Sequence, residues 1–177
     1  RRDGLTRAEF TAPVLPHATT GTAPAELAAA ALDLPLNAVG FGDHRPAVWQ
    51  GGPSFAFVPV ADLAALASAR PIEPHWSAFC QATECQSAYL YTPLSGGGYR
   101  ARMFDPAGGI PEDPATGSAS AILSAQLLAS DALQAGENKI ALEQGVEMGR
   151  PSEMGLTAVV SNGALSEIRI SGTAVPI

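Results

Sequence analysis

Residues 117–130 read GSASAILSAQLLAS and carry no charged side chain. A helix that is apolar or small on every face is usually buried on every face. In a chain of 177 residues, only the surrounding strands are available to cover such a helix. We therefore expect an α/β (α+β) fold in which a strongly curved, mixed or largely antiparallel sheet wraps around a central buried helix.

Short strands dominate the chain on both sides of this helix. The 18 glycines and 15 prolines interrupt the sequence often, which favours short elements. Strands are expected at residues 5–12, 47–50, 54–60, 76–81, 87–92, 99–104, 139–144, 156–161 and 165–171, helices at 25–34 and 61–69, and a long loop at 105–116. The Asn162-Gly163 pair predicts a tight hairpin between the last two strands. Because strands and helices do not alternate regularly, a doubly wound parallel sheet is disfavoured.

The composition is that of one folded domain with few charges. Hydrophobic residues make up 46% of the chain, charged residues 15%, and the formal net charge is -7. This balance argues against binding to nucleic acid or to an anionic membrane surface, because both need clustered Lys and Arg. No run approaches the ~18 apolar residues of a membrane span, and no secretory leader opens the sequence. We expect a cytoplasmic protein.

The cysteines and histidines give no sign of a cofactor or metal site. Cys80 and Cys85 are too few for a disulfide framework, and their C-x4-C spacing is not that of a zinc site, so we expect two reduced thiols. No phosphate-binding loop or dinucleotide fingerprint occurs, and no nucleotide cofactor is implied. His44 is interpreted as a polar loop residue and His75 as packing at the start of the strand 76–81.

The segment just before the central helix is the richest in polar and flexible residues. Residues 108–119 read GGIPEDPATGSA, so that Glu112 and Asp113 precede a Thr-Gly-Ser step. The first amides of a helix lack partners and form its positive end. Gly117 permits close approach, while Thr116 and Ser118 add hydroxyls, so the helix end can hold a carboxylate or phosphate. Thr116 can equally be an ordinary N-cap, and the residues alone leave both interpretations open.

Four stretches resemble the PhzF-like (phenazine biosynthesis PhzC/PhzF) family. They are residues 102–106 (RMFDP), 109–119 (GIPEDPATGSA), 144–152 (QGVEMGRPS) and the closing 168–175 with its glycine at 172. The resemblance implies the diaminopimelate-epimerase-like fold, in which two similar domains, each a curved sheet around a central helix, enclose a cleft. It also implies cofactor-independent proton transfer, as in an isomerase or epimerase acting on a small carboxylate-bearing substrate.

The same resemblance implies the site residues. The catalytic pair is Asp113 and Ser118. The substrate-binding residues are Gly109, Thr116, Gly117, Ser118 and Ala119, with Glu112 and Arg150 as further candidates. Arg150 either holds an anion or fastens its own turn. The family pattern implies a homodimer and neither cofactor nor metal.

The resemblance covers the C-terminal part of a family member. The Asn-Pro, glutamate-bearing and Gly-His-Ala-Thr motifs with which members begin are absent, and we interpret His17-Ala18-Thr19, which follows Pro16, as a coincidence. Residues 1–177 are thus expected to form a C-terminal domain whose closing strands, roughly 155–177, pack on an absent N-terminal domain.

Because the N-terminal half of a family member is absent, two functional interpretations remain. The general base of the isomerase would come from the N-terminal half of the same protein. Alternatively, the chain is a non-catalytic anion-binding or scaffold domain that lacks this half. Related enzymes of the same fold, such as proline racemases, use a pair of cysteines, one of which falls beside the Thr-Gly step. This sequence has Pro114 there, so a thiol-based racemase is disfavoured.

Overall fold

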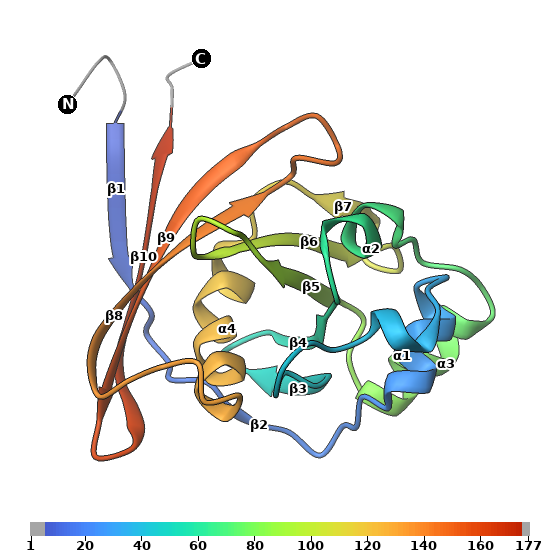
Figure 1. The fold of residues 1–177 in the computed structure, drawn as a ribbon, viewed down its shortest axis with the longest axis horizontal. Helices are drawn as coiled ribbons and strands as arrows, with labels where there is room; N and C mark the ends of the chain where they lie inside the picture. The colour runs from blue at the N-terminus through green and yellow to red at the C-terminus, as the bar shows by residue number, and fades with distance from the viewer. Residues whose placement is uncertain (1–5, 175–177) are drawn as a thin grey trace.

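The computed structural model describes residues 6–174, which form a ten-stranded sheet with four α-helices (Figure 1). Residue 5 of the expected first strand and residues 175–177 of the closing segment lie outside this range. The elements in chain order are β1 (Thr6–Thr11), β2 (His17–Ala18), α1 (Ala25–Ala31), the short 3-10 helix η1 (Leu36–Ala38), β3 (Ala47–Gln50), β4 (Ser54–Pro59), α2 (Leu63–Ser68), α3 (His75–Thr83), β5 (Ala88–Pro93), β6 (Tyr99–Asp105), β7 (Ile110–Asp113), α4 (Gly117–Ala129), β8 (Gly136–Gln144), β9 (Ser152–Ser161) and β10 (Ala164–Ala174).

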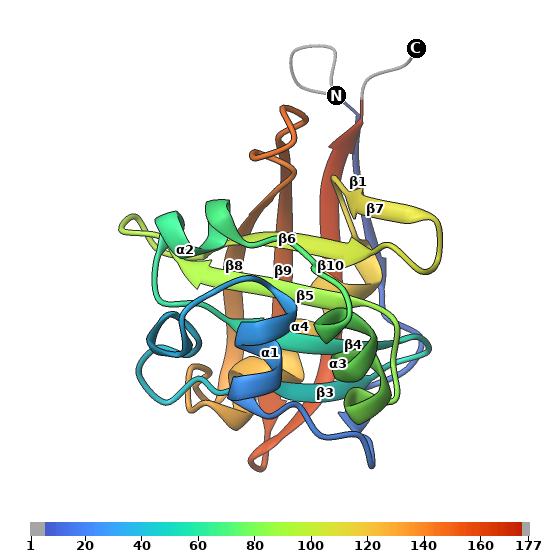
Figure 2. The same ribbon diagram turned by 90° about the vertical axis from the view of Figure 1, so that its right-hand side faces the viewer.

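The sheet is mixed and strongly curved, as the sequence predicted. Its strand order is β1-β10-β9-β8-β6-β5-β4-β3-β2, with β7 attached to β6. The β4–β5 and β6–β8 pairs are parallel, and the remaining pairs are antiparallel. Figure 2 shows the long strands β8–β10 running across the direction of β3–β6, so the sheet turns a corner where β8 meets β6.

Helix α4 lies inside this corner. In Figure 1 it has β8–β10 on one side and β3–β6 on the other. All its residues from Ala119 to Leu127 are buried, including three polar ones. Leu123 and Leu127 pack in one cluster with aromatic side chains of β4 and β5 such as Phe57 and Tyr89. The prediction of a central helix enclosed by a curved sheet is therefore confirmed.

A second core lies on the opposite face of β3–β6. Helices α1 and α3 cover this face (Figures 1 and 2). Their buried side chains, among them Leu32, Trp76 and Phe79, pack with Val58 and Leu90 of the sheet. The two clusters explain why β4 and β5 are buried along nearly their whole length, since each of these strands has a helix on both sides.

The prediction of a strand at residues 76–81 is wrong, because this stretch belongs to helix α3. The buried residues Trp76, Phe79, Cys80 and Thr83 recur with the three- and four-residue spacing of a helix face. His75 is the first residue of this helix and is exposed rather than packed at a strand start. Aromatic content had favoured a strand, but packing against α1 and the sheet decided the outcome.

Two further differences concern loops and ends. The expected loop 105–116 contains the short strand β7, which pairs with β6. The first helix ends at Ala31 instead of residue 34, and Asp33 follows with a left-handed φ of 54°.

The Asn162-Gly163 hairpin is confirmed, with positive φ values of 54° and 77° at the two turn residues.

Candidate active site at the start of helix α4

Strand β7 and helix α4 bring a carboxyl group and a helix N-terminus together. Asp113 is the last residue of β7, where it pairs with Met103 of β6. Two residues separate it from Thr116, which occupies the N-cap position just before α4. Asp113 is half-buried and Thr116 is buried. The strand pairing therefore holds the carboxyl group close to the first turn of the buried helix.

Thr116 does not cap its own helix. Its hydroxyl donates to Asp113 Oδ2 over 2.6 Å and makes no bond to the amides of the first turn. Within residues 6–174, the backbone N–H groups of Gly117, Ser118 and Ala119 have no hydrogen-bond partner. The helix end thus keeps its positive, donor-rich character, which is the property that an anion seat needs.

A buried glutamine completes this cluster and was not foreseen as a site residue. Gln144, the last residue of β8, is fully buried. Its Nε2 donates to the Asp113 carbonyl over 2.7 Å and to Thr116 Oγ1 over 2.9 Å, while its Oε1 accepts from the Thr116 backbone N–H over 3.2 Å. Its only signal in the sequence is its place in the stretch 144–152, which resembles the PhzF-like family without giving this glutamine a chemical role.

The other residues predicted for the site at the helix start differ in their exposure. Ser118 is exposed on the first turn, Gly117 is half-buried beside it, and Ala119 is buried. The ring of Phe10 lies 3.8 Å from the position that a Cβ of Gly117 would occupy. A side chain at residue 117 would therefore narrow the space between Phe10 and the helix end.

Gly109 and Glu112 are not brought to the helix start. Gly109 is an exposed residue of the β6–β7 turn, at the far end of β7 from Asp113. The carboxylate of Glu112 accepts from Arg102 Nε and Nη2, over 2.8 and 2.9 Å. Arg102 Nη1 also donates to three carbonyls at the end of α2, so Glu112 belongs to a buried link between β7, β6 and α2.

Arg150 lies in the turn between β8 and β9. Its backbone N–H donates to the Gly145 carbonyl over 2.8 Å, and its side chain is exposed without a bond to any described residue. Gly145 has a φ of +75°, and a Cβ there would lie 2.9 Å from the Pro114 carbonyl. The turn of Arg150 therefore packs against the segment that joins Asp113 to Thr116.

The part of the chain that the structure describes offers Asp113 no titratable partner. Its carboxylate accepts only from Thr116, and no ion pair reaches it. Among residues 6–174, no three His, Cys, Asp or Glu side chains gather as a metal site would require. Likewise, none of the described helices is long and apolar enough to cross a membrane.

His44 lies in the loop between η1 and β3, as predicted, but its side chain is buried instead of facing solvent. Its Nδ1 lies 2.8 Å from the Tyr91 hydroxyl, and its ring stacks on Phe41. Burial lowers the pKa of His44. Cys80 and Cys85 are unpaired, as expected, and buried. Burial raises the pKa of the Cys80 thiol to about 11, so it stays protonated near neutral pH.

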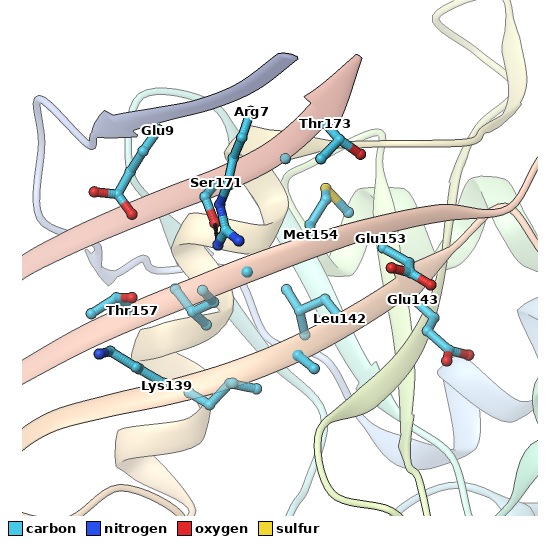
Figure 3. Close-up of a pocket in the computed structure, with 15 residues that line it drawn as sticks. Arg7, Glu9, Lys139, Leu142, Glu143, Glu153, Met154, Thr157, Ser171 and Thr173 are labelled. Carbon is cyan, nitrogen blue, oxygen red and sulfur yellow. Dashed lines mark hydrogen bonds between the residues drawn. The ribbon is translucent and has the colours of Figure 1, made fainter. Parts of the chain in front are cut away.

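A groove of about 770 Å³ lies across β1, β10, β9 and β8, and none of residues 109–119 lines it (Figure 3). Charged side chains surround it, including Arg7, Lys139 and Glu153. Arg7 of β1 donates to Ser171 Oγ of the neighbouring strand β10 over 2.9 Å. This groove is built on the closing strands and is separate from the cluster around Asp113.

Comparison with known sequences shows which family and which proteins this chain resembles. The sequence model of the phenazine biosynthesis-like protein family matches residues 2–177. An uncharacterised isomerase of Mesorhizobium japonicum is 36% identical over 183 residues, covering 100% of this chain and 61% of its own length. The trans-2,3-dihydro-3-hydroxyanthranilate isomerase of Pseudomonas chlororaphis is 34% identical over 143 residues, covering 79% of this chain and 49% of its own length.

Solved structures share the fold. A phenazine biosynthesis protein of the PhzF family from Bacillus anthracis matches with a TM-score of 0.82 and 20% identity, over 99% of this chain and 60% of that one. A hydroxyproline epimerase from Agrobacterium vitis matches with a TM-score of 0.55 and 14% identity, over 96% of this chain and 50% of that one. The chain therefore spans about three fifths or less of the length of the proteins it resembles.

Proposed function

The chain belongs to the phenazine biosynthesis-like protein family, and from this premise we propose that it carries one half of an isomerase active site. Asp113 is the acid that gives, takes or orients the proton. Its Oδ2 is held by the Thr116 hydroxyl at 2.6 Å. Its Oδ1 has no partner among residues 6–174 and is not enclosed. The carboxyl group thus has one fixed oxygen and one oxygen open to a substrate.

The start of α4 is the seat for the substrate's carboxylate. The amides of Gly117 and Ser118 lie without a partner at the start of the helix, and the exposed Ser118 hydroxyl adds a further donor, whereas Ala119 is fully buried. Such pre-oriented donors stabilise the negative charge that grows on a carboxylate-conjugated carbon when its proton leaves. The single observation that carries the proposal is this uncapped helix end within reach of a held carboxyl group.

No residue that the structure describes supplies the opposing base. A general base must be within hydrogen-bond reach of the proton that it removes, and no described residue meets Asp113 in that role. The relatives are longer than this chain, and the N-terminal half of the same protein is the source we propose. The closing strands, roughly 155–177, are the part of the chain on which that half would pack. A homodimer of the complete protein follows the most common two-fold assembly.

A non-catalytic anion-binding or scaffold role is the alternative. The observation that favours it is the lack of a second acid or base beside Asp113 in the described residues. In that case the helix end would still bind a small carboxylate, but no proton would move. Calorimetric titration with small carboxylates, run beside the exchange assay below, separates the two proposals, and the absence of heat in every titration would contradict both.

The test uses the complete protein and measures by proton NMR how fast solvent deuterium enters trans-2,3-dihydro-3-hydroxyanthranilate. This compound appears in the names of the Pseudomonas isomerases. Asp113→Asn should slow exchange by about 10²–10⁴-fold, the usual range for losing a general acid or base. Asp131→Asn is the matched control, since Asp131 is exposed at the other end of α4 and its left-handed backbone, with φ of 54°, suits asparagine. Unchanged exchange in Asp113→Asn would remove Asp113 from the mechanism.

A further inference from the structure

All the hydrogen bonds of the Gln144 side chain are made to Asp113 and Thr116. It is the last residue of β8, paired with Ala101 of β6 on one side and Ser152 of β9 on the other. Its side chain is completely buried, and its three bonds measure 2.7, 2.9 and 3.2 Å. A buried polar side chain is expensive unless it is satisfied, and this one is satisfied wholly by the two residues of the proposed site.

The orientation of this amide follows from its backbone partners. The Asp113 carbonyl can only accept a hydrogen bond, so it must face Nε2. The Thr116 N–H can only donate, so it must face Oε1. Two backbone groups of opposite kind therefore exclude the flipped amide. The second hydrogen of Nε2 is then directed at Thr116 Oγ1, 2.9 Å away.

This donation determines where the Thr116 hydroxyl points. Since Oγ1 accepts from Gln144, its own hydrogen must go elsewhere, and Asp113 Oδ2 lies 2.6 Å away as the acceptor. The result is a directed chain from the Gln144 amide through the Thr116 hydroxyl to one carboxylate oxygen. A threonine at this position would otherwise bond an amide of its own first turn as an N-cap, but here no such bond forms.

We propose that Gln144 is the positioning residue of the site: it turns the Thr116 hydroxyl onto Asp113, which orients the carboxyl group and at the same time keeps the first amides of α4 free for an anion. The inference rests on the proposed function for its catalytic meaning. Its structural content, a hydroxyl diverted from capping by a buried amide, stands on the hydrogen bonds alone. Gln144 itself touches no substrate and acts through Thr116.

The central variant is Gln144→Met, which keeps the length of the side chain and removes all three hydrogen bonds. In the complete protein, the kcat for deuterium exchange into trans-2,3-dihydro-3-hydroxyanthranilate should fall about tenfold or more, because small displacements of a catalytic group cost up to about 10²-fold. The kcat should fall by a larger factor than the KM rises. Melting temperature is measured in parallel.

Gln126→Met is the matched control. Gln126 is another buried glutamine with two strong bonds, accepting from Trp49 Nε1 and donating to the Arg45 carbonyl, each at 2.8 Å. It lies ten residues further along α4 than Thr116, or ~15 Å by helical rise. Gln126→Met should lower the melting temperature as Gln144→Met does but leave kcat unchanged. Equal kcat in the two variants would overturn the positioning role.

A double-variant cycle shows whether Gln144 acts through the hydroxyl. Thr116→Val removes the hydroxyl directly and should lower kcat, and Thr116→Ser, which restores a hydroxyl, should recover much of that loss. In the Thr116→Val background, Gln144→Met should reduce kcat little further, because the chain is already broken. Fully multiplicative losses would contradict the chain through the hydroxyl and leave Gln144 acting only through its bonds to the Asp113 carbonyl and the Thr116 N–H.

A last measurement does not depend on activity. Three-bond NMR couplings report the χ1 rotamer of Thr116, which should be single in the wild-type protein and averaged, or moved to the capping rotamer, in Gln144→Met. If the wild-type protein exchanges no deuterium, the proposed function fails, but the rotamer result still decides the role of Gln144. Identical couplings in both proteins would overturn the inference, whatever the activity.

Discussion

Replacing Arg102 with methionine should lower the free energy of unfolding by about 3–5 kcal/mol, the usual loss when one partner of a buried ion pair is removed. The Arg102 side chain is 10% exposed and that of Glu112 is 15% exposed. The change removes two bonds to the Glu112 carboxylate, three bonds to the end of α2 and the contact with the Phe104 ring, 4.6 Å from the guanidinium carbon. The dominant part of the loss is the carboxylate left buried without its cation.

A second variant, Arg102→Met with Glu112→Leu, isolates the cost of the unpaired carboxylate. With the carboxylate gone as well, the double variant should be more stable than Arg102→Met alone, although the α2 carbonyls remain unpaired. Urea denaturation followed by far-UV circular dichroism measures both. In a chain of this size each kcal/mol is worth about 2–4 °C of melting temperature, so Arg102→Met should melt about 6–20 °C lower. A loss below about 1 kcal/mol, or additive losses in the double variant, would refute the account.

Two further predictions concern buried titratable groups. Burial holds the pKa of His44 below its usual 6.5. The unfolded chain therefore binds a proton at this histidine more readily than the folded chain does. As a result, the folded state loses stability as the pH falls below about 6.5, and it loses none at this residue at higher pH. The unfolding free energy of His44→Gln should therefore depend less on pH between 4.5 and 7 than that of the wild type; equal slopes in the two proteins would contradict the prediction. Cys80, with its pKa raised to about 11, and the buried Cys85 should react with a disulfide reagent at pH 8 far more slowly in the native protein than in guanidinium, and two rapidly reacting native thiols would contradict their burial.

The enclosed helix could be predicted from the sequence because its signal is local and strong. Fourteen consecutive residues without a charge, 117–130, can be stable in a helix only if every face is covered. The Asn162-Gly163 hairpin is equally local, since the positive φ angles of its turn favour those two residues. Both predictions needed nothing beyond the conformational preferences of a few neighbouring side chains.

The segment 75–83 shows where local signals fail. A short apolar stretch that contains Trp76 and Phe79 is compatible with a strand or with a buried helix. The helix formed because its apolar face packs against α1 and the outer face of the sheet. The burial of His44 is also a tertiary effect. Its polar neighbours Asp43 and Arg45 indicate a surface loop, but Phe41 and Tyr91 enclose its ring.

The candidate site likewise combines residues that are neighbours in the sequence with one that only the fold brings close. The order of residues alone placed Asp113, Thr116, Gly117 and Ser118 together, because they are neighbours in the chain at a helix start. Only the tertiary structure brought in Gln144, 28 residues from Thr116, since the pairing of β8 with β6 and β9 sets its place. Whether the threonine caps its helix or holds a carboxyl group depends on which donor reaches its hydroxyl. That is a matter of three-dimensional position, which residue order does not contain.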